Sequence, residues 1–345
     1  MIGVLLVDDS PSVRAVLRRL FAKTRDIRVV GEAADGAQAV QMVIDLQPQV
    51  VVMDLQMPVL DGYAATERIM AMRPTPIVVL TSKANRNQMQ TAFEAMRRGA
   101  LEVLPKPEDT PSWQQLAESL PETVRTVALA QTAPRTARRA RSVRPEALVD
   151  SPRELRWVAI GASTGGPAAI RELLAAVPAD PPVGFLIVQH IASGFELGFA
   201  DWLNKEFPFD VRLAQDGEAL RRGMVRLAPG GAHLRLEADG ILRLDSQTPA
   251  RRGHRPSVDD LFHSCAECCP RQVAGVLLTG MGADGVEGLL ALRKAGGITL
   301  VQDEASCVVF GMPRVALEKG AADVALPPRA LAQTLIRLWK KGGEP

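Results

Sequence analysis

Short apolar runs alternate with amphipathic segments over the first 110 residues. Around residues 13–21, for example, Val13, Leu17 and Leu20 fall on one face of a helix. The runs between such helices are rich in Val, Ile and Leu, which is typical of strands buried on both faces of a parallel sheet. Five strand–helix repeats with right-handed crossovers predict a doubly wound α/β domain. Its predicted strands are Ile2–Val7, Ile27–Ala33, Val50–Asp54, Pro76–Ser82 and Leu101–Lys106.

A second series of strands and helices begins at Trp157 and predicts another doubly wound parallel sheet. A β-hairpin interrupts this series, because His233–Glu237 and Ile241–Asp245 flank an Ala-Asp-Gly turn. The other predicted strands are Trp157–Ala162, Phe185–Gln189, Val211–Ala214, Val273–Leu278, Thr299–Gln302 and Asp323–Ala325. The predicted helices are Pro167–Val177, Phe195–Phe207, Val258–Cys268, Val286–Ala295, Pro313–Lys319 and Arg329–Lys340.

The stretch between the two series lacks an apolar period. A helix from Pro111 to about Leu129 is followed by residues 131–152, which are rich in Arg, Pro, Thr and Ser and typical of a solvated linker. We therefore predict a first domain over residues 1–125, a basic flexible linker over residues 126–153 and a second domain over residues 154–345.

The composition agrees with two globular cores. The chain has 345 residues, of which 47% are apolar and 23% charged, and this excludes a mostly disordered or collagenous protein. The net charge of +2 has a local origin: residues 1–110 carry 13 basic and 13 acidic side chains, residues 157–345 carry 20 and 21, and residues 111–156 carry 8 and 5. The positive surplus therefore belongs to the linker region, and we expect no nucleic-acid partner.

The sequence predicts neither a membrane segment nor an export signal. Its apolar runs are far shorter than the roughly 20 residues of a membrane helix. The N-terminal MIGVLLVDDS has no basic region and reaches two aspartates within ten residues, unlike a signal peptide. We expect a cytoplasmic protein without membrane insertion.

Charged and hydroxyl side chains follow the strands of the first domain. Because ligands bind at the carboxyl ends of the strands in an open parallel sheet, these groups should meet at one edge. Clustered carboxylates repel unless a hard cation such as Mg²⁺ lies among them, and one carboxylate could attack a phosphoryl group. The side chains are Asp8 and Asp9 after the first strand, Asp54 after the third, Thr81 and Ser82 after the fourth, and Lys106 after the fifth.

The sequence GASTGGP, residues 161–167, lies between a predicted strand and a predicted helix of the second domain. Its amides could hold a phosphate at the helix N-terminus. Alternatively, Ser163 could be the exposed nucleophile of a Gly-x-Ser-x-Gly turn. The segment could also be only a tight turn, and the loop alone does not decide among the three.

A serine nucleophile needs a base and a group that orients the base. Among the four histidines, His190 directly follows an apolar strand, so it shares a sheet edge with Ser163. The orienting carboxylate should also follow a strand; Asp284 fits this position, and Asp216 and Asp303 are rivals. The order serine, histidine, aspartate differs from that of α/β-hydrolases, which argues against that family but not against the chemistry.

Three cysteines and a histidine lie close together near residue 265. His263, Cys265, Cys268 and Cys269 offer soft ligands, so a metal site is conceivable. The cysteines nevertheless recur with Leu261 at helical spacing, which favours an apolar stripe on a buried helix.

The motifs VDDS, MDLQMPVLDG, VLTS and LPKP of the first domain resemble the receiver domain of two-component response regulators. The resemblance covers residues 1 to about 125. It implies a flavodoxin-like fold, phosphorylation by a histidine kinase of the chemotaxis type, and Mg²⁺ as the cofactor of phosphorylation. The implied residues are Asp54 as phosphoacceptor, Asp8, Asp9, Asp54 and the Gln56 carbonyl at the metal, Lys106 at the phosphate, and Thr81 as the switch hydroxyl with Ser82 as an alternative.

The motifs GASTGGP, VQHIASGF, AQDG, LAPGGAHL, GHRPSVDDLF and LLTGMGADG of the second domain resemble the catalytic domain of the chemotaxis protein-glutamate methylesterase (CheB) family. This resemblance covers about residues 157–340 and implies a Rossmann-like hydrolytic domain. The implied residues are Ser163 as nucleophile, His190 as general base and acid, Asp284 as the group that orients it, and the Met281 backbone N–H as an oxyanion donor.

Together, the two resemblances imply a phosphorylation-activated serine esterase of chemotaxis adaptation. It would hydrolyse glutamate methyl esters on methyl-accepting chemoreceptors, release methanol and deamidate receptor glutamines, with no cofactor for ester hydrolysis. In this hypothesis the unphosphorylated receiver covers the active site, and phosphorylation of Asp54 weakens that docking.

Two functions of other classes remain as alternatives. The receiver could control a nucleic-acid-binding domain, although the second domain lacks a helix-turn-helix signature and is slightly acidic. Residues 161–167 could instead hold a nucleotide phosphate. No acidic residue about 20 positions beyond that loop is well placed for a ribose, since Asp180 precedes two prolines.

Overall fold

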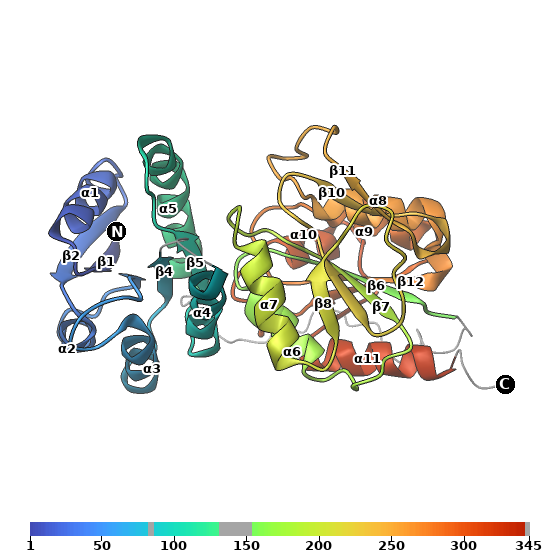
Figure 1. The fold of residues 1–345 in the computed structure, drawn as a ribbon, viewed down its shortest axis with the longest axis horizontal. Helices are drawn as coiled ribbons and strands as arrows, with labels where there is room; N and C mark the ends of the chain where they lie inside the picture. Colours follow the sequence, from blue (N-terminus) through green and yellow to red (C-terminus); the bar gives the residue numbers. More distant parts are fainter. Residues whose placement is uncertain (82–85, 131–153, 342–345) are drawn as a thin grey trace. The chain divides into compact units, whose positions relative to one another are not determined.

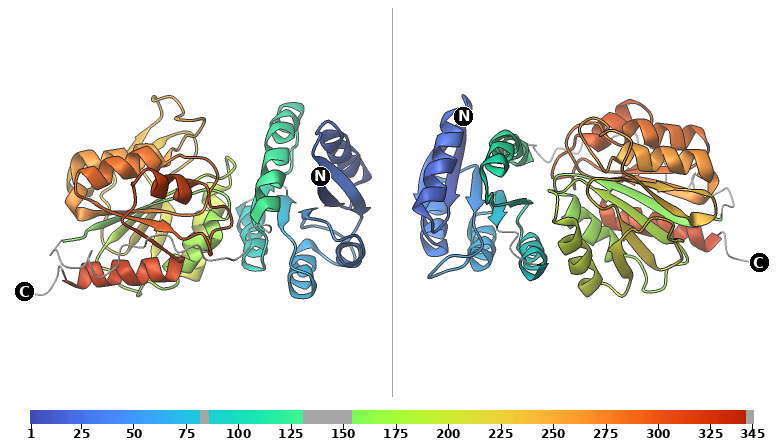
Figure 2. Two further views of the ribbon diagram at one scale, coloured as in Figure 1. Left: turned by 180° about the vertical axis from the view of Figure 1, so that it is seen from behind. Right: turned by 45° about the horizontal axis from the view of Figure 1, so that its top comes forward.

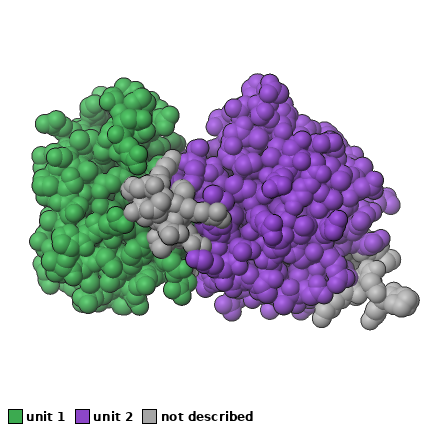
Figure 3. Space-filling view, in the orientation of Figure 1, with its two compact units in different colours: residues 1–134 green, residues 135–345 purple. Residues whose placement is uncertain are grey.

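The computed structural model describes residues 1–81, 86–130 and 154–341, which belong to two compact units, Met1–Pro134 and Arg135–Pro345 (Figure 3). Each unit contains a parallel sheet with helices on both faces, which confirms the predicted fold class (Figure 1). Within the described ranges, every helix is too short or too polar to cross a membrane.

The first unit is built on a five-stranded parallel sheet in the order β2-β1-β3-β4-β5. Helices α1 and α5 cover one face, and α2, α3 and α4 cover the other (Figure 1). Leu17 and Phe21 of α1 share a core with Leu120 and Val124 of α5, because their apolar stripes face the same strands. The elements are β1 (Ile2–Val7), α1 (Pro11–Ala22), β2 (Ile27–Ala33), α2 (Gly36–Leu46), β3 (Val50–Met53), α3 (Gly62–Met72), β4 (Ile77–Thr81), α4 (Arg86–Arg97), β5 (Glu102–Pro105) and α5 (Thr110–Ala130).

The last helix of this unit matches the predicted helix from Pro111 to about Leu129 to within about one residue at each end. Because α5 continues through Ala130, residues 126–130 of the predicted linker are helical. The rest of the predicted linker, residues 131–153, lies outside the described residues.

The second unit is built on a seven-stranded sheet in the order β14-β13-β12-β6-β7-β9-β8. Helices α8, α9 and α10 cover one face, and α6, α7 and α11 cover the other (Figure 2). The predicted hairpin forms a separate two-stranded sheet, β10–β11, that packs on α8. The elements are β6 (Trp157–Ala162), α6 (Gly166–Leu174), β7 (Gly184–Gln189), α7 (Glu196–Glu206), β8 (Asp210–Leu213), β9 (Met224–Leu227), β10 (His233–Leu236), β11 (Leu242–Asp245), α8 (Val258–Cys268), β12 (Val273–Leu277), α9 (Val286–Lys294), β13 (Ile298–Gln302), α10 (Met312–Glu318), β14 (Val324–Leu326) and α11 (Pro328–Lys341).

Strand β9 is absent from the sequence prediction. Its third residue, Arg226, breaks the apolar run, yet only 2% of this side chain is exposed. The guanidinium lies 2.9 Å from Asp210 and 2.7 Å from Glu218, so its buried charge is paired with two partly exposed carboxylates. The other predicted strands and helices differ from the observed ones only at their ends.

In both sheets the order in which successive strands are added reverses next to predicted site residues. In the first unit β1 lies between β2 and β3, and in the second unit β6 lies between β12 and β7. The loops that follow neighbouring strands at such a switch point diverge to opposite faces and leave a crevice at the carboxyl edge. The loops after β1 and β3, and those after β6 and β12, are therefore the places to look for chemistry.

Candidate functional site

Ser163 lies in the loop between β6 and α6, at the carboxyl edge of the second sheet. Gly165 in this loop has a φ of 76°, and a Cβ at this position would lie 2.6 Å from Val308. The Ser163 N–H donates to the Thr279 carbonyl at 3.0 Å, and the Gly166 N–H donates to the Ser163 carbonyl at 2.7 Å. Because two loop amides are used inside the protein, the loop is poorly suited to hold a phosphate.

His190 contacts Asp284 across the sheet edge. The Nε2 atom of His190 lies 2.8 Å from Oδ2 of Asp284, and only 9% and 2% of the two side chains are exposed. A carboxylate at Nε2 places the ring proton on that nitrogen. Nδ1 is buried and, within the described residues, makes no hydrogen bond, including none to Ser163. The rivals lie elsewhere, since Asp216 bonds to the backbone of Leu244 in the hairpin and Asp303 to Ser306.

The N-terminus of α8 holds the carboxylate of Asp284. The backbone N–H groups of Val258 and Asp259 donate to it at 2.8 and 3.1 Å, and the Ser257 hydroxyl donates at 2.7 Å. Burial alone would raise the pKa of Asp284, but hydrogen bonds from His190, Ser257 and the helix hold that pKa well below its usual range. Asp284 therefore remains ionised beside His190. In the sequence, the signal for Ser257 is its place just before a predicted helix.

A second histidine, His254, stacks on His190. The ring centroids are 3.8 Å apart and the ring planes differ by 4°. Burial and the neighbouring His190 lower the pKa of His254, so this residue favours its neutral form. Sequence reasoning missed the contact, because His254 lies in a loop with no strand end to fix its position.

Two buried polar side chains connect the loops at this edge. The Gln189 amide nitrogen Nε2 donates to the carbonyls of Ser163 at 2.9 Å and of His190 at 2.8 Å. The Thr279 hydroxyl donates to the Thr164 carbonyl at 3.0 Å. The loops after β6, β7 and β12 are thus joined to one another, which fixes the backbone around Ser163 and His190.

Met281 lies in the loop after β12, next to Gly280. A Cβ at position 280 would lie 2.7 Å from the Cβ of Ser163, so a glycine is needed for the two loops to approach this closely. The Met281 side chain is 47% exposed. The loop therefore brings the backbone of Met281 to the edge at which Ser163 lies.

The predicted acidic residues of the first unit also come together. The carboxylate oxygens of Asp8, Asp9 and Asp54 lie within 4.8 Å of one another. The Lys106 ammonium lies 2.8 Å from both Asp8 and Asp54. Burial disfavours this ammonium, but its bonds to the two carboxylates outweigh that effect and raise the pKa of Lys106. Carboxylate oxygens next to an exposed loop are the donor set that suits Mg²⁺.

The remaining predicted residues of the first unit lie around this cluster. Thr81 ends β4 and is buried, and its carbonyl accepts the Lys106 N–H at 2.7 Å. Gln56 is exposed two residues after Asp54, and its N–H lies 3.4 Å from Oδ1 of that aspartate. Ser82, the alternative to Thr81, lies outside the described residues.

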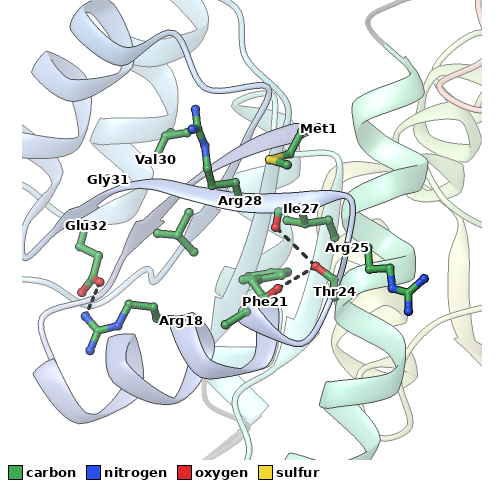
Figure 4. A pocket seen from close by; sticks show the side chains of 12 residues that line it. Met1, Arg18, Phe21, Thr24, Arg25, Ile27, Arg28, Val30, Gly31 and Glu32 are labelled. Carbon is green, nitrogen blue, oxygen red and sulfur yellow. Dashed lines mark hydrogen bonds and ion pairs between the residues drawn. The ribbon is translucent and has the colours of Figure 1, made fainter.

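A cavity of about 670 Å³ lies elsewhere in the first unit, between α1 and the edge strand β2 (Figure 4). Phe21 and Ile27 form part of its wall, and Arg18 and Glu32 form an ion pair at its rim. The lining contains no predicted site residue, so this cavity is separate from both clusters.

The cysteines of α8 pack as the sequence predicts. Cys265 is fully buried in the core with Leu261 and Phe262, and Cys268 and Cys269 pack against the same core while half-buried.

Comparisons with known proteins cover both units. A family model described as CheB methylesterase matches residues 158–335, and a model described as response regulator receiver domain matches residues 4–118. A protein of Anaeromyxobacter dehalogenans named protein-glutamate methylesterase/protein-glutamine glutaminase 3 is 44% identical over 344 residues, which are 98% of this chain and 99% of the relative. The chain belongs to the CheB methylesterase family.

Other relatives agree with this assignment of a CheB-family chain. A Geobacter metallireducens protein named protein-glutamate methylesterase/protein-glutamine glutaminase 4 is 42% identical over 345 residues, covering 98% of this chain and 99% of the relative. The crystal structure of the Thermotoga maritima CheB methylesterase catalytic domain matches with a TM-score of 0.52 and 36% identity, over 53% of this chain and 98% of that domain. The family predicted from the motifs is thereby confirmed.

Proposed function

We propose that this CheB-family chain is a phosphorylation-activated protein-glutamate methylesterase and protein-glutamine glutaminase. Its substrates would be glutamate methyl esters and specific glutamines of methyl-accepting chemoreceptors, and it would act in the cytoplasm. The observation that carries the proposal is the junction at the second sheet edge, where Gln189 joins the Ser163 loop to His190 and His190 lies 2.8 Å from Asp284.

In this mechanism Ser163 attacks the ester carbonyl while His190 takes its proton. The free nitrogen Nδ1 is the acceptor, because Asp284 occupies Nε2 and holds the proton there. The negative charge of Asp284 stabilises the imidazolium that forms. The Met281 N–H donates to the developing oxyanion, a contribution that in serine hydrolases amounts to about 3 kcal/mol.

Collapse of the tetrahedral intermediate releases methanol with the proton from His190. Water, activated by the same nitrogen, then hydrolyses the acyl-enzyme and regenerates Ser163. The glutaminase reaction follows the same steps, with ammonia as the leaving group in place of methanol. Neither reaction needs a cofactor in the second unit.

The receiver would accept a phosphoryl group on Asp54 from a chemotaxis histidine kinase. Bound Mg²⁺, held by Asp8, Asp9, Asp54 and the Gln56 carbonyl, would supply positive charge against the phosphoryl group. The Lys106 ammonium, 2.8 Å from Asp54, would pair with the phosphoryl oxygens, and the Thr81 hydroxyl would turn toward them. We further propose that the unphosphorylated receiver inhibits the hydrolase and that phosphorylation relieves this inhibition.

Methanol release from a methylated receptor tests the proposed reaction. We expect Ser163→Ala to lower the rate at least a thousandfold, because removal of the nucleophile of a serine hydrolase costs up to about a millionfold in kcat. The full chain should be assayed with and without acetyl phosphate. Ser246→Ala, at an exposed hairpin serine, is the matched control. Normal methanol release by the Ser163 variant would refute the mechanism.

A further inference from the structure

Two adjacent cysteines at the end of α8, Cys268 and Cys269, belong to neither of the sites described above. Their Sγ atoms lie 2.6 Å apart, and both side chains are half-buried. They line a cavity of about 420 Å³ in the second unit. The exposed side chains of Arg156 and Arg271 line the same cavity. The exposed carboxylate of Asp239 also lines it, so the two neighbouring thiols face an open space whose rim carries two positive charges and one negative charge.

The two thiols differ in the direction of their pKa shifts. The contact between the two sulfurs lowers the pKa of Cys268 and raises that of Cys269, while the charges of Glu267 and Glu237 act against the Cys268 thiolate. Arg156 adds positive charge close to Cys269. The other cysteines differ, since burial raises the pKa of Cys265 and of Cys307. Nucleophilic cysteines are accessible and bear a stabilised thiolate, and among the four cysteines Cys268 is the one whose pKa is lowered.

We propose that Cys268 and Cys269 form a vicinal dithiol that exchanges with anionic low-molecular-weight disulfides. The Cys268 thiolate attacks the small disulfide, forms a mixed disulfide and releases one small thiolate, which takes the proton of Cys269. The Cys269 thiolate then attacks Sγ of Cys268 and releases the second small thiolate. In total, two cysteine thiols are oxidised to one disulfide, and the small disulfide is reduced to two thiols.

The charge of the cavity selects the class of reagent. Glutathione disulfide carries several carboxylates, which Arg156 and Arg271 attract toward the sulfur pair, and Asp239 offsets only one of these two positive charges. A neutral disulfide of similar reactivity gains nothing from these side chains. The site is thus a modification site distinct from the serine site, and it does not depend on the proposed esterase activity.

Intact-mass measurement of the full chain after incubation with glutathione disulfide tests the exchange. We expect a loss of about 2 Da in the wild-type protein, as two thiols become one disulfide. Cys269→Ser should stop at the mixed disulfide on Cys268, and Cys268→Ser should react at least about tenfold more slowly. Cys307→Ser is the matched control and should lose the same mass as the wild type.

A separate variant, Arg271→Gln, tests the preference for anionic disulfides. Arg271→Gln should slow the reaction with glutathione disulfide about threefold at low ionic strength, but should leave the reaction with neutral hydroxyethyl disulfide unchanged. The proposal is overturned if the wild-type mass does not change, if the protein stops at a mixed disulfide, or if Cys268→Ser still loses 2 Da. Equal slowing of both reagents in Arg271→Gln would also contradict it.

Discussion

At the scale of single residues, Ser257 stabilises the negative charge of Asp284. Its hydroxyl donates to the carboxylate at 2.7 Å, and both residues are buried. Ser257→Ala removes this bond, and we expect the free energy of unfolding at pH 7 to fall by about 1–3 kcal/mol. Urea unfolding of the variant and of the exposed control Ser246→Ala measures the loss.

The pH dependence of the stability lost in Ser257→Ala follows from the direction in which the pKa of Asp284 is shifted. Because the folded pKa lies below the ordinary 3.8, ionised Asp284 contributes stability above about pH 4, and this contribution is lost as the pH falls through the folded pKa. Asp284 is ionised in both folded proteins between pH 4 and 7, so Ser257→Ala should cost the same at pH 5 and pH 7. A loss that disappears at pH 5 would show that another group is involved.

Gln189 is the residue that joins nucleophile and base through the backbone. Its Nε2 donates to two carbonyls, and Gln189→Glu would place a carboxylate oxygen against both. We expect kcat for methanol release to fall about tenfold or more with little change in KM, because the loops of Ser163 and His190 shift slightly. Gln247→Glu, at an exposed glutamine, is the control. A rise in KM with unchanged kcat would contradict a positioning role.

The topology of a parallel sheet predicts that His190 and Asp284 share an edge because both follow strands, but it also left Asp216 and Asp303 as rivals, and the family resemblance pointed to Asp284. Sequence reasoning did not predict His254 or Ser257. Both lie in the long connection between β11 and α8, whose path depends on tertiary packing. The sequence therefore predicts candidate side chains that follow strands, but not the loop side chains that contact them.

At the scale of elements, the start of α6 requires a glycine at position 165 for two separate reasons, its backbone conformation and a close contact. Gly165 has a φ of 76°, and a Cβ there would lie 2.6 Å from Val308. Gly223 has a similar φ of 74°, but nothing lies within 4 Å of a Cβ at that position. The two glycines thus separate the effect of backbone conformation from that of close contact.

Alanine at each position should measure the two effects. We expect Gly223→Ala to lower the free energy of unfolding by about 1–2 kcal/mol through the left-handed backbone alone. Gly165→Ala should lose about 1–3 kcal/mol more, because its Cβ overpacks against Val308. Chemical denaturation of both variants measures the difference. Equal losses would mean that the contact with Val308 relaxes without cost.

The elements that the sequence predicted best have an unbroken apolar pattern, such as β6 and β12, in which every residue is buried. Strand β9 was missed because Arg226 looks polar in the sequence, and its burial depends on ion pairs with Asp210 and Glu218 on other segments. Such pairing between distant segments leaves no periodic signal in the strand itself.

At the scale of the whole molecule, each of the two units has its own hydrophobic core. One core joins α1 and α5 of the first unit with its strands, and another joins α8 and α9 of the second unit with its own strands. Each core lies within one unit, and each of the two candidate sites is assembled from loops of a single sheet. The proposed control of the hydrolase by phosphorylation therefore requires coupling between the two units.

Removal of the first unit tests that communication. Because the second unit has its own sheet and core, we expect residues 154–345 to fold alone and to ignore acetyl phosphate. If the unphosphorylated receiver inhibits, the fragment should release methanol about five- to a hundredfold faster than the unphosphorylated full chain, a typical range for coupling between sites. The rate of methanol release by equal amounts of folded protein measures this difference.

The full chain with Asp54→Asn is the matched control for the fragment, since it keeps the receiver but lacks the proposed phosphoacceptor. It should retain the slow basal rate and lose stimulation by acetyl phosphate. A wild-type rate that rises with acetyl phosphate only to that of the fragment means that phosphorylation acts by relief of inhibition. A fragment no faster than the unphosphorylated chain would contradict inhibition and leave the proposed esterase reaction intact, because Ser163→Ala tests that reaction separately.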